Sequence, residues 1–182
     1  MKYTILDCYT DEPAGLGVPP YLGTYPRYIA GYLGNDVTYL TIDDLRLWKK
    51  NNSEIKTIKP SQKTDITTYN LTINYKNIKK ILEETDTLIV VLGVHVPGKY
   101  LSAIPGTLYE IIQLIKNLNC KKILTGPAVF GTQLFGGRFF EKADLSVFDK
   151  VDYEMFNFSY KDVKEYALNG ASIIKQIPDY RM

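Results

Sequence analysis

Few side chains in this sequence are suited to chemistry, and most of them lie in two stretches rich in glycine and proline. Asp7, Asp11 and Glu12 form a small acidic cluster, which suits a cation, an amide or the hydrogen bonds of a loop. His95 is the single histidine and lies in the second stretch. The sequence has no Ser-His-Asp or Cys-His set with a recognisable local signature. We therefore predict no catalytic residue and no metal ligand in this chain.

The sequence also lacks the common phosphate-binding motifs. It contains no Gly-x-x-x-x-Gly-Lys-Ser/Thr loop, and Gly15-Leu-Gly17 is not followed by the later glycine of the dinucleotide fingerprint. Apolar and aromatic side chains instead stand beside glycine backbone in the loops; they are Leu16, Val18, Tyr21, Leu22, Tyr100 and Phe130. Such a surface suits a large, flat, amide-rimmed ligand better than a phosphate.

Composition narrows the class of protein. A length of 182 residues suits one domain, and a hydrophobic content of 45% is enough to bury a core. The formal net charge of +2 does not indicate a nucleic-acid partner. Cys8 and Cys120 are isolated rather than spaced as metal ligands or a disulfide framework, which favours a reducing, cytoplasmic location. We find no signal peptide and no apolar run long enough to span a membrane.

The elements that would position these loops follow a strand–loop–helix order. Tyr3–Leu6 is predicted to be the first strand, and the long loop to Arg27 follows it. Thr24 and Pro26 suit the start of a helix, which Gly34-Asn35 would end. The next predicted elements are a strand at Asp36–Leu40, a helix at Asp43–Trp48, a helix within Asn70–Glu84, a strand at Thr87–Leu92 and a strand at Lys121–Leu124.

Local signals refine this order. Thr87–Leu92 is apolar without alternation, which predicts a central parallel strand buried on both faces. Thr107-Leu-Tyr-Glu110 is a capping box and predicts a helix start. The polar segment Lys49–Asp65 is expected to be a mobile insertion or an irregular loop. Toward the carboxyl end we predict a fifth strand at Asp144–Phe148 and a helix at Tyr160–Leu168 that ends before Gly170.

The order of elements predicts an α/β, Rossmann-like fold. It is a doubly wound, mostly parallel sheet with helices on both faces, in three αβα layers. Ligands of such sheets bind at the carboxyl ends of the strands. The loops after the first, third and fourth strands, which include residues 11–27, 93–106 and 126–131, should therefore converge on one crevice.

The first loop carries a family resemblance. Asp7-Cys-Tyr-Thr-Asp-Glu-Pro-Ala-Gly-Leu-Gly-Val-Pro-Pro-Tyr-Leu-Gly-Thr-Tyr-Pro-Arg27 resembles the start of archaeal proteins that join an amino-terminal cobalamin-binding domain to a radical SAM barrel. Val91-Leu-Gly-Val-His-Val-Pro-Gly-Lys-Tyr-Leu101 and Leu124-Thr-Gly-Pro127 resemble the second and third loops of that group. The tail Ala171-Ser-Ile-Ile-Lys-Gln-Ile-Pro-Asp-Tyr180 resembles the segment that leads into the barrel.

The resemblance implies a cobalamin module at 1–170 and a linker-like tail at 171–182. The corrin would lie across the carboxyl ends of the strands, with cobalamin as the cofactor and a radical SAM domain as partner in cis or in trans. A 4Fe-4S cluster and S-adenosylmethionine would belong to that other domain, which makes the full-length protein a methyltransferase. The cofactor-binding residues would be Leu16, Gly17, Val18, Pro20, Tyr21, Leu22, Gly93, Val94, His95, Tyr100, Gly126, Pro127, Phe130, Gly131, Gly136 and Gly137. Gly136 and Gly137 would wall the slot for the nucleotide tail, so Gly137→Leu is expected to weaken binding about tenfold.

The sequence departs from the wider cobalamin family in two ways. The Asp-x-His-x-x-Gly motif, which supplies a lower axial ligand, has no histidine here, and His95 lies in another loop. The Cys-x-x-x-Cys-x-x-Cys motif of radical SAM domains is absent, since Cys8 and Cys120 are the only cysteines. Two other functions stay open at this point. One is a ligand-free interaction domain, and the other is a stand-alone α/β enzyme that uses Asp11, Glu12 or His95.

Overall fold

The computed structural model describes residues 1–8, 24–49, 77–92, 106–126, 129, 132–133, 140–141, 144–152 and 159–173. Five parallel strands form the main sheet in the order β2-β1-β3-β4-β7. Their bounds are Tyr3–Asp7 for β1, Val37–Thr41 for β2, Thr87–Val91 for β3, Lys121–Thr125 for β4 and Lys150–Val151 for β7. The chain leaves β1 for one neighbour and returns to β3 on the other side, so the strand order reverses between β1 and β3. This is the doubly wound order that the sequence predicted.

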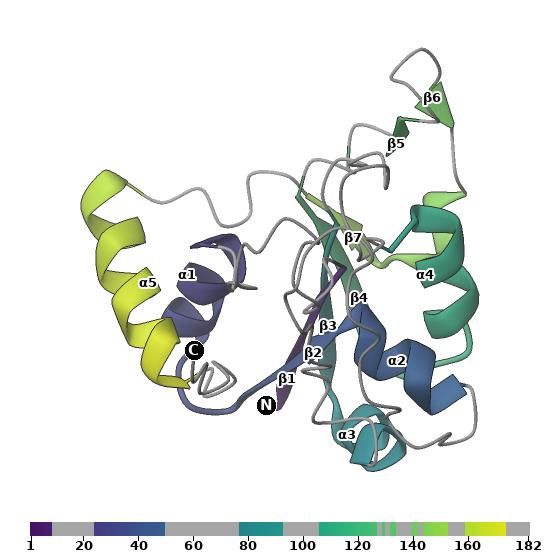
Figure 1. Cartoon of the computed structure of the whole chain (residues 1–182), viewed down its shortest axis with the longest axis horizontal. Helices are drawn as coiled ribbons and strands as arrows, with labels where there is room; N and C mark the ends of the chain where they lie inside the picture. Colours follow the sequence, from purple (N-terminus) through teal and green to yellow (C-terminus); the bar gives the residue numbers. More distant parts are fainter. Residues whose placement is uncertain are drawn as a thin grey trace, which may run out of the picture.

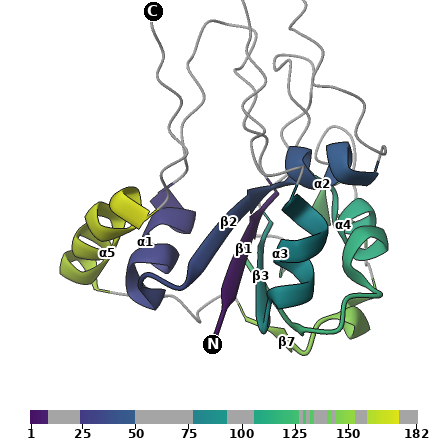
Figure 2. The same ribbon diagram turned by 90° about the horizontal axis from the view of Figure 1, so that it is seen from below.

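Helices cover both faces of this sheet. Their bounds are Thr24–Leu33 for α1, Ile42–Lys49 for α2, Ile78–Glu84 for α3, Leu108–Ile115 for α4 and Tyr160–Ile173 for α5. Figure 1 shows α1 and α5 on one side of the sheet and α2, α3 and α4 on the other, and Figure 2 shows the same layers from below. The predicted three-layer αβα arrangement is therefore confirmed. A short antiparallel pair, β5 (Thr132–Gln133) and β6 (Phe140–Glu141), lies outside the main sheet.

The strands divide the core into two clusters because successive side chains point to opposite faces. On β1, Ile5 packs with Ile29 and Ala30 of α1, whereas Leu6 packs on the other face with the α2 and α4 side chains. The central strand β3 is buried along its whole length, with no residue more than 5% exposed. The prediction of a central strand buried on both faces is confirmed.

Two glycines set the distance between α1 and α5. A Cβ on Gly31 of α1 would overlap the carbonyl oxygen of Tyr166 in α5, and a Cβ on Gly170 of α5 would overlap that of Arg27 in α1. The two helix backbones are therefore in direct contact. The prediction that Gly170 follows the end of the helix is wrong, because this glycine is buried inside α5. Its role is close packing rather than the left-handed turn that ends many helices.

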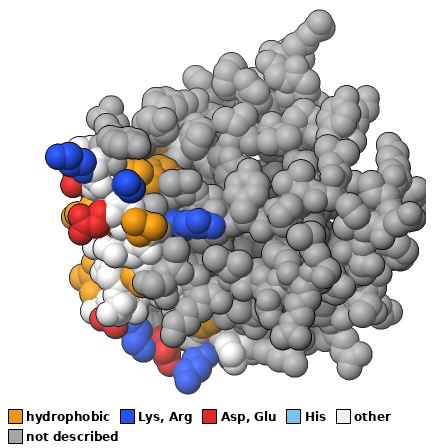
Figure 3. All heavy atoms as spheres, turned by 60° about the vertical axis from the view of Figure 1, so that its left-hand side comes forward, with side chains coloured by type: hydrophobic (Ala, Val, Ile, Leu, Met, Phe, Trp, Pro, Cys, Tyr) orange, Lys and Arg blue, Asp and Glu red, His pale blue; other side chains and the backbone are white. Residues whose placement is uncertain are grey.

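The outer surface of this helix pair is mixed in charge. Figure 3 shows Lys and Arg, Asp and Glu, and apolar side chains interspersed on the side of the molecule that α5 occupies. Exposed Lys161, Lys164 and Glu165 lie close along α5, and Leu168 and Tyr32 add apolar surface. This face, in its described part, carries no block of a single sign of charge.

The fifth strand is not where the sequence predicted it. Leu145–Val147 forms a 3-10 turn, labelled η4, and the strand β7 follows it at Lys150–Val151. The Asp144 side chain accepts a hydrogen bond from the Ser146 backbone N–H at 2.9 Å, which favours a turn over an extended chain. The predicted strand at Asp144–Phe148 is wrong for this reason.

Several predicted segments lie wholly or partly outside the described residues. The expected insertion Lys49–Asp65 is described at Lys49 alone, and the predicted helix within Asn70–Glu84 is described from residue 77. Helix α5 continues through residues 171–173, and 174–182 are outside the described part.

Candidate functional site

Four of the five strands of the sheet end in one row of side chains at its carboxyl edge. We call Thr41, Asp7, Val91 and Thr125 the terminal row, since the strand register pairs them across β2, β1, β3 and β4. Paired residues of parallel strands project to the same face, and here that face is the one covered by α1. All four residues are at most 3% exposed. The row thus holds one carboxyl group and two hydroxyls away from water, on both sides of the point where the strand order reverses.

A tyrosine hydrogen-bonds the carboxyl group of the row. The Tyr39 hydroxyl, on β2, donates to Asp7 Oδ2 at 2.7 Å, and both residues are buried. A buried polar group costs free energy unless it is hydrogen-bonded, so Tyr39 offsets part of the cost of burying Asp7. The hydrogen bond fixes the orientation of Asp7, the last residue of β1 before the first loop.

A second tyrosine holds the far end of the row. The hydroxyls of Tyr25, in the first turn of α1, and Thr125, at the end of β4, are 2.6 Å apart. The Tyr25 and Tyr28 rings form a T-shaped pair with centroids 4.8 Å apart. Tyr25 is half-buried, whereas Thr125 is fully buried. The start of α1 is therefore tied to the strand that ends before the third loop.

The backbone joins the ends of the first and second loops. The N–H of Gly106, the last residue of the second loop, donates to the carbonyl oxygen of Cys8 at 2.7 Å, and Cys8 precedes the first loop. The Cys8 N–H donates in turn to the Val91 carbonyl at 3.0 Å. The described ends of the two loops thus meet between β1 and β3, while the predicted convergence of the loops themselves concerns residues outside the described part.

Gly126 is the one predicted cofactor-binding residue in the described part of the chain. Its φ is +94°, a conformation that residues with a Cβ rarely adopt. A Cβ there would lie 2.6 Å from the Leu92 carbonyl oxygen, so the turn after β4 requires glycine. The predicted residues outside the described part are Leu16, Gly17, Val18, Pro20, Tyr21, Leu22, Gly93, Val94, His95, Tyr100, Pro127, Phe130, Gly131, Gly136 and Gly137.

Two helices begin at this edge through reciprocal capping. In α2, Asp44 Oδ2 accepts from the Thr41 N–H at 3.0 Å, and Thr41 Oγ1 accepts from the Asp44 N–H at 3.3 Å. In α4, Thr107 Oγ1 accepts from the Glu110 N–H at 3.1 Å, which confirms the predicted capping box. The Thr-x-x-Asp spacing at 41–44 is the same signal, and it would have predicted that α2 starts directly after β2.

An ion pair connects the two helices. The Arg46 Nε donates to Glu110 Oε1 and the Arg46 Nη2 to Glu110 Oε2, both at 2.8 Å. Partial burial acts to raise the pKa of Glu110, but the Arg46 guanidinium and the Thr107 N–H outweigh it and the pKa lies below its usual value. This bidentate geometry is the strong form of a side-chain ion pair.

The thiol at the start of the first loop is chemically quiet. Cys8 is 1% exposed, and its Sγ lies 3.9 Å from the Leu6 carbonyl oxygen. Burial raises the pKa of the Cys8 thiol well above its usual value, and the charge of Asp7 adds to the rise. A thiol that stays protonated is a poor nucleophile and a poor metal ligand. Over the described ranges, no three His, Cys, Asp or Glu side chains are arranged to hold a metal ion.

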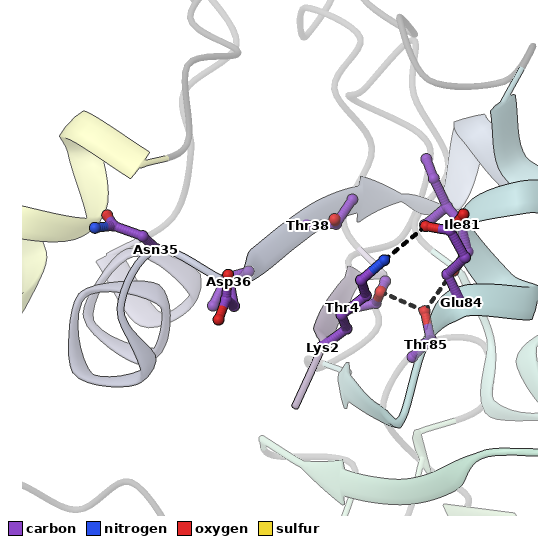
Figure 4. Close-up of a pocket in the computed structure, with 9 residues that line it drawn as sticks. Lys2, Thr4, Asn35, Asp36, Thr38, Ile81, Glu84 and Thr85 are labelled. Atoms are coloured by element: carbon purple, nitrogen blue, oxygen red, sulfur yellow. Dashed lines mark hydrogen bonds and ion pairs between the residues drawn. The ribbon is translucent and has the colours of Figure 1, made fainter.

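A second polar region lies at the opposite, amino edge of the sheet. A pocket of about 170 Å³ is bounded there by Lys2, Thr4, Asn35, Asp36, Val37, Thr38, Ile81, Glu84 and Thr85. Figure 4 shows Lys2 reaching across to Glu84, and their charged atoms are 2.9 Å apart. Thr85 Oγ1 donates to the Ile81 carbonyl at 2.7 Å, so the Thr4 hydroxyl must donate to Thr85. Two pairs of polar side chains in this lining, Lys2 with Glu84 and Thr4 with Thr85, thus bind each other.

Sequence reasoning missed the side chains that dominate the described site: Tyr25, Tyr39, Asp44 and Thr125. A usable signal exists for two of them. Thr125 ends a strand, at the position where a doubly wound sheet binds its ligand, and Asp44 completes the Thr-x-x-Asp capping signal. The two tyrosines leave no such pattern, because their partners are 32 and 100 residues away in the chain.

Comparisons with known proteins give two archaeal relatives. An uncharacterized protein of Methanocaldococcus jannaschii is 34% identical over 97% of this chain and 32% of its own length. An uncharacterized protein of Archaeoglobus fulgidus is 29% identical over 99% of this chain and 30% of its own length. The chain thus spans about a third of the length of these curated relatives. No protein-family model and no solved structure matches it. None of the helices in the described part has the length and apolar character that a membrane crossing needs.

Proposed function

We propose that this chain is a cobalamin-binding module of a larger protein. The observation that carries the proposal is the meeting of loop ends at the carboxyl edge. Gly106 bonds to Cys8 beside β3, and Tyr25 bonds to Thr125 beside β4, in a chain whose first loop resembles those of cobalamin domains. Sheets of this strand order bind flat cofactors at the edge where the order reverses.

The chemistry of the described site fits such a cofactor. The periphery of the corrin carries primary amides, which both donate and accept hydrogen bonds. The terminal row and its tyrosines place hydroxyl and carboxyl groups at this edge, beside the glycine turn at Gly126. Anionic phosphate groups would instead favour a glycine-rich phosphate loop or a positive cluster, and the sequence lacks that loop.

The module would bind cobalamin without a histidine ligand from an Asp-x-His-x-x-Gly motif. The chain's own residues would hold the corrin by its amides and exclude water from the terminal row, while cobalamin, when bound, would supply a centre for alkyl transfer. We assign the cluster cysteines and S-adenosylmethionine to a radical SAM domain in cis or in trans, since Cys8 and Cys120 lack the spacing of a cluster motif. The relatives are about three times as long as this chain, which leaves room for that domain.

We infer a cytoplasmic location. Cys8 and Cys120 are both free thiols, which fits a reducing compartment. The relatives' organisms are archaea.

A ligand titration tests the function. Hydroxocobalamin is titrated into the purified chain, and binding is followed by the visible spectrum and by equilibrium dialysis, with flavin mononucleotide as the matched flat ligand. We expect saturable binding of hydroxocobalamin and none of the flavin, because the flavin also needs a phosphate site. No saturable binding of hydroxocobalamin, or tighter binding of the flavin, would refute the proposal.

A further inference from the structure

Arg27 carries a positive charge that no acceptor in the described part of the chain satisfies. It is the fourth residue of α1 and follows Tyr25, which ties the start of this helix to the carboxyl edge. Its Nε is the one buried side-chain nitrogen or oxygen among the described residues that has no hydrogen-bond partner. The ion pairs of the described part do not include Arg27 either. A buried donor without an acceptor costs free energy, so this nitrogen indicates a missing acceptor.

Arg46 shows which kind of acceptor suits this side of a guanidinium. Its Nε donates to Glu110 Oε1 and its Nη2 to Glu110 Oε2, both at 2.8 Å. The Nε side of an arginine thus presents two parallel N–H groups to two oxygens of one anion. Arg27 has the same pair of groups, and its Nε donates to no described oxygen. The missing acceptor is therefore expected to be an oxyanion that presents two oxygens together, as a carboxylate or a phosphate does.

The contact between α1 and α5 places Arg27 at the end of both helices that faces the carboxyl edge. The Arg27 backbone lies against Gly170, and Gly31, one turn further along α1, lies against Tyr166. The two helices therefore run antiparallel, and the last turn of α5 lies beside the first turn of α1. Arg27 as a whole is half-buried, and neither of its Nη atoms is among the buried atoms that lack a partner. An anion can therefore approach the guanidinium from solvent and needs no enclosed cavity.

A purely structural role would require an acceptor inside the protein. Arginine side chains near a helix end often donate to the carbonyl groups of its last turn. The last turn of α5 lies beside Arg27, but no carbonyl in its described part accepts from Nε. The guanidinium thus lacks the contact that a capping arginine makes.

We propose that Arg27 is an oxyanion-binding residue at the junction of α1 and α5. Its Nε–H and one Nη–H would each donate to one oxygen of the anion. One guanidinium forms a weak, single-point site, unlike a phosphate loop that surrounds its ligand. The inference goes beyond the proposed function and does not rest on it. The phosphodiester in the nucleotide tail of cobalamin and a free phosphate offer the same oxygens, and the experiment separates these two sources.

Thermal unfolding of the full chain tests the inference. Wild type and variants are compared in Tris chloride with sodium phosphate added at constant ionic strength. Arg27→Met keeps most of the aliphatic stem and removes the guanidinium. Arg27→Lys keeps the charge but loses the paired N–H groups, and it serves if the methionine variant does not fold by circular dichroism. Lys164→Met is the matched control, because Lys164 is an exposed cation on α5.

We expect phosphate to raise the Tm of the wild type saturably, by about 2–5 °C, because it binds the folded state alone. Arg27→Met should lose this saturable rise, Arg27→Lys should keep less than half of it, and Lys164→Met should keep all of it. Any general effect of phosphate on stability is common to all four proteins. Equal phosphate responses in the wild type and both Arg27 variants would overturn the inference.

The Tm without phosphate gives a second test. Arg27→Met should then unfold at or above the temperature of the wild type, because it removes an unsatisfied buried donor. A loss in Tm as large as that of Arg46→Met would mean that Arg27 already has an acceptor within the chain, and the inference would be wrong.

Titrations with two corrinoids identify the source of the oxyanion. Hydroxocobalamin carries a phosphodiester in its nucleotide tail, and dicyanocobinamide lacks that tail. If Arg27→Met weakens hydroxocobalamin alone, by about fivefold, the oxyanion belongs to the cofactor. Unchanged affinities together with a lost phosphate response would assign Arg27 to a separate anion. If the wild type binds neither corrinoid, the proposed function is wrong, whereas the phosphate response still decides the role of Arg27.

Discussion

The polar side chains at the two edges of the sheet differ in their burial. At the carboxyl edge, Asp7 and Thr125 are buried and each is hydrogen-bonded by a tyrosine from another element. At the amino edge, Lys2 and Glu84 form an ion pair whose side chains are 63% and 45% exposed. Both edges belong to the same parallel strands, so the strands themselves do not explain the difference.

The difference indicates at which edge polar side chains contribute most to the stability of the fold. An exposed ion pair contributes little, because water solvates both charges and long side chains lose entropy in pairing. Buried polar groups must be satisfied, and their loss is costly. The exposed Lys2–Glu84 pair at the amino edge should therefore contribute little to stability, whereas the carboxyl edge should be sensitive to single changes. Four predictions follow this contrast, from the largest effect to the smallest.

The largest effect is expected at the glycine after β4. Gly126→Ala would strain the backbone, because φ is positive there. It would also place a Cβ 2.6 Å from the carbonyl oxygen of Leu92, the residue that follows β3. We expect a loss of about 2–4 kcal/mol in the free energy of unfolding, or about 5–15 °C in Tm. Thermal and denaturant unfolding measure it.

Gly34 provides the control for this experiment. It has a φ of +91° after α1, at the opposite edge, and a Cβ there would meet nothing within 4 Å. Gly34→Ala should therefore cost only the backbone strain, about 1 kcal/mol. Equal losses at Gly34 and Gly126 would show that the close approach to Leu92 has no energetic weight.

The second prediction compares the side-chain pairs of the two edges. Tyr39→Phe removes the hydroxyl that donates to buried Asp7, and we expect a loss of about 2 kcal/mol and about 4–8 °C in Tm. Lys2→Gln removes the exposed pair with Glu84 and should leave the midpoint within experimental error. A larger loss for Lys2→Gln than for Tyr39→Phe would reverse the comparison.

Much of the sheet could be predicted from sequence because its signals are local. The apolar run at Thr87–Leu92 predicted the central strand, and the Thr107–Glu110 spacing predicted the start of α4. The failures came from signals that compete over a few residues. Asp144 caps a turn within a run that otherwise favours a strand, and Gly170 suits both a helix end and a close helix contact. Only the position of α1 shows that Gly170 serves a close helix contact rather than a helix end.

The side-chain partners at the carboxyl edge could not be predicted from the sequence. The positive φ of Gly126 explains why glycine follows β4, whereas its contact with a cofactor stays a prediction. Tyr39 and Tyr25 were not identified, because a tyrosine hydroxyl acquires its role only when folding brings Asp7 or Thr125 within hydrogen-bond distance. Spacing in the sequence carries no record of such contacts, whereas a capping pair three residues apart does.

The third prediction concerns pH and the helices that begin at the carboxyl edge. The Arg46 ion pair lowers the pKa of Glu110 against the effect of partial burial. Glu110 therefore stays ionised to a lower pH in the folded state than in the unfolded chain. The pair therefore stabilises the fold above the ordinary pKa of about 4.5, and this contribution disappears as pH falls through the lower folded pKa.

Thermal unfolding of wild type and Glu110→Gln from neutral pH to pH 3 measures this contribution. The difference in Tm should be present at pH 7 and shrink below about pH 4.5. Arg46→Met should remove the same pH-dependent part, and the double variant should add nothing further, because the two side chains form one pair. A difference that stays constant down to pH 3 would contradict the assignment.

The smallest effect is chemical rather than energetic and uses the two cysteines, one at each edge. Cys8 follows β1 at the carboxyl edge and is 1% exposed, whereas Cys120 precedes β4 at the amino edge and is half-buried. Burial raises the pKa of both thiols, to a much greater extent at Cys8, and the positive charge of Lys122 opposes the rise at Cys120. We expect a disulfide reagent such as Ellman's to modify Cys120 at least about tenfold faster than Cys8 in the native protein. Cys120→Ala should keep the slow phase and Cys8→Ala the fast one, and denaturant should make the rates equal. Equal rates in the native protein would mean that the reagent reaches Cys8 as readily as Cys120. The contrast between the two edges would then be contradicted.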